Sequence, residues 1–125
     1  MTDTQVRNAI AVLAVKTQDG ELRWEKSDPP SNLTRTIDAR IDLCYLTSYE
    51  GKNLRLYERK ERSFISEYED WYWGSSIILE MIDDEGRTLD TFPNVTTLNE
   101  LWSAVRSQIS GINNFIGNLT GSLAS

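Results

Sequence analysis

The chain has 125 residues, 19 acidic and 13 basic side chains, a formal charge of −6 at pH 7, a single cysteine and no histidine. Without histidine it cannot assemble the common zinc ligand sets or the Ser-His and Cys-His nucleophile pairs, and its acidic charge disfavours nucleic acid and anionic membranes as partners. We therefore expect residues 1–125 to form one domain without catalytic, metal or cofactor chemistry.

The first predicted element is a helix over residues 4–18. Asp3 or Thr4 is available as its N-cap, and Gly20 provides the left-handed residue that commonly ends a helix. A broad apolar face predicts that the helix is mostly buried. That face comprises Val6, Ile10, Leu13, Val12 and Val15.

The middle of the chain predicts an antiparallel β-meander. Residues 21–25 alternate polar and apolar side chains, as a short strand does, and residues 37–47 do so over a longer stretch. Turn-forming residues at 49–53 then lead into an extended segment over 54–62, and a second hairpin has arms at 76–82 and 87–92. The longer alternation predicts one sheet face shared by Ala39, Ile41, Leu43 and Tyr45.

Three features of this meander have both a chemical and a structural interpretation. Cys44 lies inside a strand, which favours a small buried hydrophobe over a nucleophile. Residues 55–62 carry four basic side chains interrupted by Glu58 and Glu61, a pattern that predicts a solvated sheet face rather than a phosphate site. Residues 83–86 lack the ligand spacing of a calcium loop, so they are predicted to form a turn.

Aromatic and acidic side chains alternate within residues 63–75. This segment either extends the flanking strands into a ribbon or forms a loop that folds back over the sheet. Its rings either form a contact surface, with neighbouring carboxylates that favour a basic partner, or cover the sheet as core. The candidate partner or ligand contacts are Tyr68, Trp71, Tyr72 and Trp73.

A long C-terminal helix is predicted from Thr97, where Thr97 and Glu100 form a capping box, to about residue 120 or beyond. Its apolar residues follow a heptad seam, whose first half we expect on the sheet and whose second half needs another surface. A single helix of this length would extend beyond the strands, which favours a homodimer. The seam comprises Leu98, Trp102, Val105, Ile109 and the candidate dimer contacts Ile112, Ile116, Leu119 and Leu123.

These elements predict the α+β class, in which an antiparallel meander of four to five strands has the N-terminal and long C-terminal helices packed on one face. We expect a cytoplasmic, non-enzymatic protein-protein interaction module of the adaptor, chaperone-like or inhibitor/immunity-like kind, acting as a homodimer, with no nucleic-acid or membrane partner. The alternative is a small-ligand binder with an aromatic pocket between sheet and helix. That pocket would be lined by Trp24, Trp71, Trp73 and Trp102.

Overall fold

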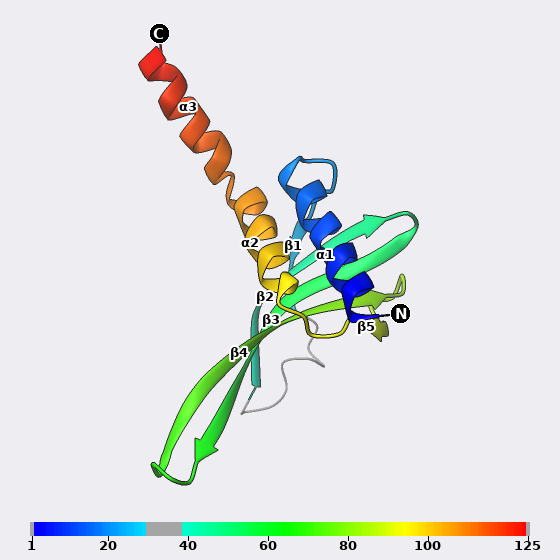
Figure 1. Cartoon of the computed structure of the whole chain (residues 1–125), viewed down its shortest axis with the longest axis vertical. Helices are drawn as coiled ribbons and strands as arrows, with labels where there is room; N and C mark the ends of the chain where they lie inside the picture. The colour runs from blue at the N-terminus through cyan, green and yellow to red at the C-terminus, as the bar shows by residue number, and fades with distance from the viewer. Residues whose placement is uncertain (1, 30–38, 125) are drawn as a thin grey trace. The chain divides into compact units, whose positions relative to one another are not determined.

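The computed structural model of the chain describes residues 2–29 and 39–124, with side chains described as far as residue 121 (Figure 1). Its contacts form two compact units. The helical unit comprises Met1–Glu25 and Val95–Ser125, and the sheet unit comprises Lys26–Asn94. The helices and the five-stranded sheet confirm the predicted α+β class. That the whole chain forms a single domain stays a prediction.

The helical unit begins with α1, Asp3–Gln18. Its N-cap is Thr2 rather than the predicted Asp3 or Thr4. The Thr2 hydroxyl accepts from the Gln5 backbone N–H at 3.2 Å, and the Gln5 side chain accepts from the Thr2 N–H at 3.0 Å. The predicted stop is confirmed, with Gly20 at φ +79. Val12 and Val15 are 51% and 53% exposed, so the buried face is narrower than predicted. Helical spacing turns both valines away from the buried stripe.

The second helix, α2, spans Thr97–Ser110 and buries Leu98, Leu101, Trp102, Ala104 and Val105. The predicted capping box at its start is wrong, since Thr96 already has helical angles and the buried Thr97 hydroxyl has no hydrogen-bond partner among the described residues. Bonds from the Leu98 N–H to the Val95 carbonyl and from the Asn99 N–H to the Thr96 carbonyl, both 3.1 Å, close the first turn instead.

The side chain of Gln108 in α2 forms hydrogen bonds to the end of α1 and to the loop that follows it. Its carbonyl oxygen accepts from the Trp24 N–H at 2.8 Å, and its amide donates to the carbonyls of Leu22 at 2.7 Å and Thr17 at 3.0 Å. The Trp24 indole also donates to the Thr17 hydroxyl at 3.0 Å. Most of the segment predicted as a strand over 21–25 is therefore a loop, because one side chain supplies the backbone partners that a neighbouring strand would supply.

The predicted single C-terminal helix is wrong, because Gly111 adopts φ +69 and divides it. Its N–H donates to the Ser107 carbonyl at 3.1 Å, which ends α2, and a separate helix α3 spans Ile112–Ala124. Because the chain forms two shorter helices here, the length of a single helix no longer favours a homodimer. Neither these helices nor α1 is long and apolar enough, in the part of the chain described, to cross a membrane.

The sheet unit holds strands in sequential order: β1 Glu25–Ser27, β2 Ala39–Tyr49, β3 Lys52–Ile65, β4 Asp70–Ile82 and β5 Thr88–Thr91. The pairs β2–β3, β3–β4 and β4–β5 are antiparallel, so the predicted meander and its two hairpins are confirmed. Glu50 and Gly51 both have positive φ, at 50 and 78, as a tight two-residue hairpin turn requires.

A β-bulge interrupts the regular alternation of β2. Ile41 pairs with Arg59 and Cys44 with Tyr57, so three steps along β2 match two steps along β3. Because of the extra residue, every later side chain of β2 lies on the face opposite to the one that uninterrupted alternation would give it. Tyr45, paired with Leu56, therefore lies on the face opposite Ile41, and the prediction that they share one face is wrong.

Candidate functional site

Past Ala39, the first residue of β2, β3 and β4 continue as an aromatic ribbon, defined here as residues 62–73 (Figure 1). Their pairing runs without a register shift from Asn53 opposite Ile82 to Ile65 opposite Asp70. In the described chain, β2 accompanies β3 only as far as Ala39 opposite Glu61. Of the two predicted arrangements for residues 63–75, the structure has the ribbon.

The ribbon distributes its aromatic side chains over two faces and a turn. Pairing of Arg62 with Trp73 and of Phe64 with Trp71 places these four on one face, because directly opposed residues lie on the same side of a sheet. Tyr72 lies on the other face, and Tyr68 lies in the turn. The exposed fractions are 51% for Phe64, Trp71 and Trp73, 49% for Tyr72 and 75% for Tyr68. These rings do not fill a core.

The structure thus brings Trp71 and Trp73 together and separates Tyr72 and Tyr68 from them. Phe64 completes the aromatic face and was not among the predicted contacts. Its ring centroid lies 5.2 Å from that of Trp71, with the planes tilted by 53°. Only the hairpin register places Phe64 opposite Trp71, and the sequence alone did not reveal that register.

Two arginines of the same unit stack on the indoles. The guanidinium carbon of Arg62 lies 4.4 Å from the ring centroid of Trp71, and that of Arg40 lies 5.5 Å from the ring centroid of Trp73. Each exposed cation–π contact contributes roughly 0.5–1 kcal/mol. Arg40 is held in turn by Asp42, at 3.1 Å. The rings are therefore oriented by their neighbours although they are half exposed.

The turn at the end of the ribbon is acidic. Glu67, Glu69 and Asp70 are all exposed, and Glu69 adopts φ +50. The Tyr68 N–H donates to the Ile65 carbonyl at 3.2 Å, and the Asp70 carboxylate accepts from the Trp71 N–H at 2.7 Å. These carboxylates lie next to the aromatic face and favour a cationic partner.

Below the ribbon, the sheet contains a buried ion pair, so the predicted solvated face is wrong at Arg55, whereas Arg59 is exposed as predicted. Side chains of Arg55 and Glu80 are only 4% and 7% exposed and lie 3.0 Å apart. Arg55 also donates to the Gly86 carbonyl at 2.9 Å and to the Thr88 hydroxyl at 3.1 Å, and Thr88 donates to Glu80 at 2.9 Å. The guanidinium is thus occupied by protein groups. A lone charge within the apolar run of residues 77–82 was the sequence signal for this pair.

Cys44 and Tyr57 lie together with Ile41 in a small buried cluster. Burial raises the pKa of the Cys44 thiol from 9.0 to about 11, an effect that nearby Arg55 opposes and Glu80 reinforces. Burial and then Glu80 raise the pKa of Tyr57 to about 12. Both groups are protonated at neutral pH, and the prediction that Cys44 is a buried small hydrophobe is confirmed.

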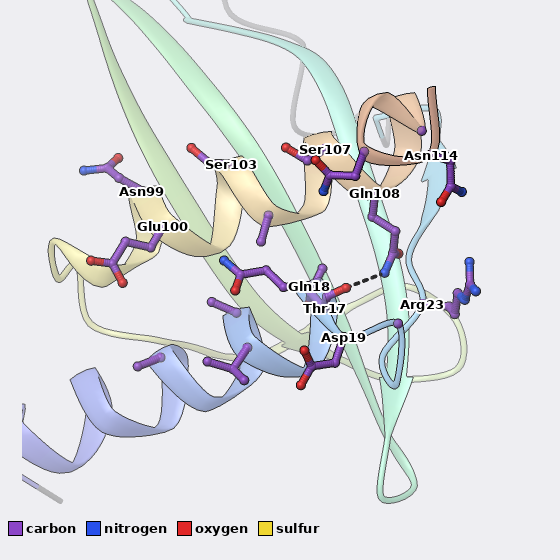
Figure 2. Close-up of a pocket in the computed structure, with 17 residues that line it drawn as sticks. Thr17, Gln18, Asp19, Arg23, Asn99, Glu100, Ser103, Ser107, Gln108 and Asn114 are labelled. Carbon is purple, nitrogen blue, oxygen red and sulfur yellow. Dashed lines mark hydrogen bonds between the residues drawn. The ribbon is translucent and has the colours of Figure 1, made fainter. Parts of the chain in front are cut away.

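The helical unit contains an open groove of about 1050 Å³ between α1 and α2 (Figure 2). Polar side chains dominate its wall, and Figure 2 shows the Gln108 bond to Thr17 there. No aromatic side chain is among the described residues that line it. Trp24 and Trp102 are instead 4% and 8% exposed in the core. Because Trp71 and Trp73 belong to the sheet unit, the aromatic ligand pocket stays a prediction.

Helix α3 exposes an apolar face. Ile112, Phe115, Ile116 and Leu119 are 48%, 63%, 50% and 54% exposed and recur at helical spacing. The side chain of Leu123, the fourth predicted dimer contact, lies outside the described residues. Phe115 was missed because it falls off the heptad seam. No charged residue follows Arg106 in the sequence, so this face has no electrostatic pattern to select a partner.

Within residues 2–29 and 39–124, no three histidine, cysteine, aspartate or glutamate side chains are grouped as a metal site would need. No family model, curated protein or solved structure matches the chain. A function is therefore inferred from the side chains described above.

Proposed function

We propose that the chain is a non-enzymatic, cytoplasmic protein-binding module whose contact surface is the aromatic ribbon. The observation that supports this most directly is the half-exposed face of Phe64, Trp71 and Trp73 with arginines stacked on both indoles. Tryptophan, tyrosine and arginine are the residues most enriched at interface hot spots. Rings already held in place lose less side-chain entropy when a partner binds.

The shape of the ribbon favours a macromolecule over a small ligand. Small-molecule sites are concave and bury most of the ligand, whereas the two-stranded ribbon presents its rings on one open face. The acidic turn with Glu67, Glu69 and Asp70 adds a preference for basic partners. Such a surface is compatible with an adaptor, chaperone-like or inhibitor-like role.

The test compares Trp71→Ala/Trp73→Ala with Leu89→Ala, which removes a 63% exposed apolar side chain elsewhere on the sheet. Proteins captured by the chain are identified, and the dissociation constant is then measured with purified partner. Loss of two hot spots weakens binding by about a hundredfold or more, whereas Leu89→Ala leaves it unchanged. Unchanged affinity of the double variant, or failure of that variant to fold, would contradict the assignment of these rings as a contact surface.

We further propose that α3 forms a weak homodimer through Ile112, Ile116, Leu119 and Leu123. Burying each half-exposed apolar side chain yields roughly 1 kcal/mol, so the described ones from two copies give a gross gain of roughly 8 kcal/mol with Phe115 included. Association costs about 4–15 kcal/mol, which leaves little net affinity. A concentration-dependent dimer is therefore expected.

Light scattering across a micromolar to millimolar range tests this dimer. The mass of the unaltered chain should rise above 14.3 kDa with concentration. The mass of Ile116→Asp should stay at that of the monomer. A mass of 14.3 kDa at every concentration would exclude the dimer.

A further inference from the structure

Within residues 2–29 and 39–124, no segment pairs with the outer edge of β4 along the aromatic ribbon. In the described chain, β5 pairs only with Glu80, Met81 and Ile82, and the Phe92 N–H donates to the Leu79 carbonyl at 2.9 Å. The backbone N–H and C=O of Leu79 therefore point away from β3. In an antiparallel strand this direction alternates from residue to residue, and the β3–β4 register has no shift. The residues that share the outward direction are Trp71, Trp73, Ser75 and Ile77.

Most of these outward backbone groups have no partner among the residues that the structure describes. The Asp70 carboxylate accepts from the Trp71 N–H at 2.7 Å, but no described residue bonds the outward groups of Trp73, Ser75 or Ile77. Natural sheets protect such edges with lysine, proline, bulges or very short strands. Residues 71–79 contain no charge and no proline. The edge is chemically open to another strand.

We propose that the partner of the ribbon binds as an additional strand along this edge, as an extended segment of alternating apolar and basic residues. This inference rests on the proposed function and specifies the class of its partner. Backbone bonds to Trp73, Ser75 and Ile77 provide the register. Apolar side chains of the added strand pack beside the indoles.

Charge selects the composition of the added strand. The acidic turn lies at one end of the open edge, and the whole chain has a charge of −6. Basic side chains at that end of the added strand gain attraction from Glu67, Glu69 and Asp70. A second copy of this chain would bring the same negative charge to the edge, so it is disfavoured.

Amide hydrogen exchange on the ¹⁵N-labelled full chain tests the proposal, with a capped peptide of alternating valine and lysine as the probe. In the free protein, the amides of Tyr72, Gly74 and Ser76 should exchange slowly because they face β3, while those of Trp73, Ser75 and Ile77 exchange fast. Saturating peptide should slow the second set by about tenfold or more. The same peptide with a central proline is the control, since it cannot complete the ladder.

Several outcomes would overturn strand addition. One is that the peptide shifts only indole resonances and leaves exchange of the outward amides fast. Others are that the proline peptide binds equally well, or that the valine-lysine peptide does not bind. Protection of the outward amides without peptide, together with a doubled mass, would assign the edge to a second copy. None of these outcomes touches the affinity loss of Trp71→Ala/Trp73→Ala for its captured partner, so the proposed function is judged separately.

A substitution isolates the backbone contribution. Ser75 is exposed and its N–H points away from β3, so Ser75→Pro removes an outward donor and leaves the β3 ladder intact. Ser75→Pro should weaken peptide binding by about tenfold or more, and Ser75→Ala, which keeps the N–H, should not. Equal binding by both variants would contradict strand addition. Because the exchange experiment uses the unaltered chain, it remains decisive if Ser75→Pro disrupts the ribbon.

Discussion

Burial, rather than distance, is expected to decide how much the ion pairs of the sheet contribute to its stability. Arg55 and Glu80 lie 3.0 Å apart with side chains 4% and 7% exposed, while Arg59 and Glu61 on the same strand lie 2.8 Å apart with side chains 44% and 51% exposed. Removing one member of a buried pair leaves an uncompensated charge and costs about 3–5 kcal/mol. An exposed pair contributes about 0–1 kcal/mol.

The perturbation is a double-mutant cycle on the full chain. Arg55→Met and Glu80→Gln should each lower the free energy of unfolding by about 3–5 kcal/mol, and Arg55→Met/Glu80→Gln should cost less than the sum of these two single changes. Arg59→Met is the matched control, and it should cost less than about 1 kcal/mol. Denaturant unfolding followed by circular dichroism provides the measurement.

Two results would contradict the expected effects of burial and of coupling between Arg55 and Glu80. In the first, Arg55→Met and Arg59→Met cost the same, which would mean that burial is not decisive. In the second, the Arg55 and Glu80 changes are additive, which would mean that the two side chains are not coupled.

Three further predictions concern the rest of the chain. Gln108→Ala should lower the free energy of unfolding by about 2–4 kcal/mol because it leaves buried groups such as the Trp24 N–H without a hydrogen-bond partner. Gln18→Ala, at an exposed position, should have little effect in thermal unfolding. Because the pKa of Cys44 is raised in the folded chain, the unfolded chain loses the thiol proton first as the pH rises. The free energy of unfolding should therefore fall between pH 9.0 and about pH 11. In denaturant titrations across this range, Cys44→Ala should make that fall less steep. Gly111→Ala should destabilise the left-handed break by about 1 kcal/mol and shift residues 110–113 toward continuous helix in backbone chemical shifts; unchanged shifts would contradict this account of the break.

Local pattern was sufficient to predict the class and most of the elements. The stripe of Val6, Ile10 and Leu13 predicted α1, and turn residues such as Gly51 predicted the hairpins. These features depend on neighbours in sequence, so they were accessible without a structure. The same applies to the interpretation of Cys44 as a buried residue.

The failures share a dependence on distant partners or on a single backbone conformation. The heptad seam continued across Gly111 in sequence, but a left-handed glycine ends the helix there. Burial of Arg55 depends on Glu80, which is placed opposite it only by the β3–β4 register. The loop containing Trp24 depends on Gln108, far along the chain. In the candidate site, Phe64 was missed for the same reason as Glu80.

The bulge between Ile41 and Cys44 affects how related sequences should be aligned. It adds one residue to β2 relative to β3, so Ile41 and Tyr45 are both buried but lie on opposite faces of the sheet. A relative that lacks one residue at Asp42 or Leu43 would keep residues 44–49 opposite the same β3 residues and on the same faces, with regular alternation restored along the strand. A one-residue gap at this point, with the polarity pattern unchanged on either side of it, is therefore compatible with the same sheet.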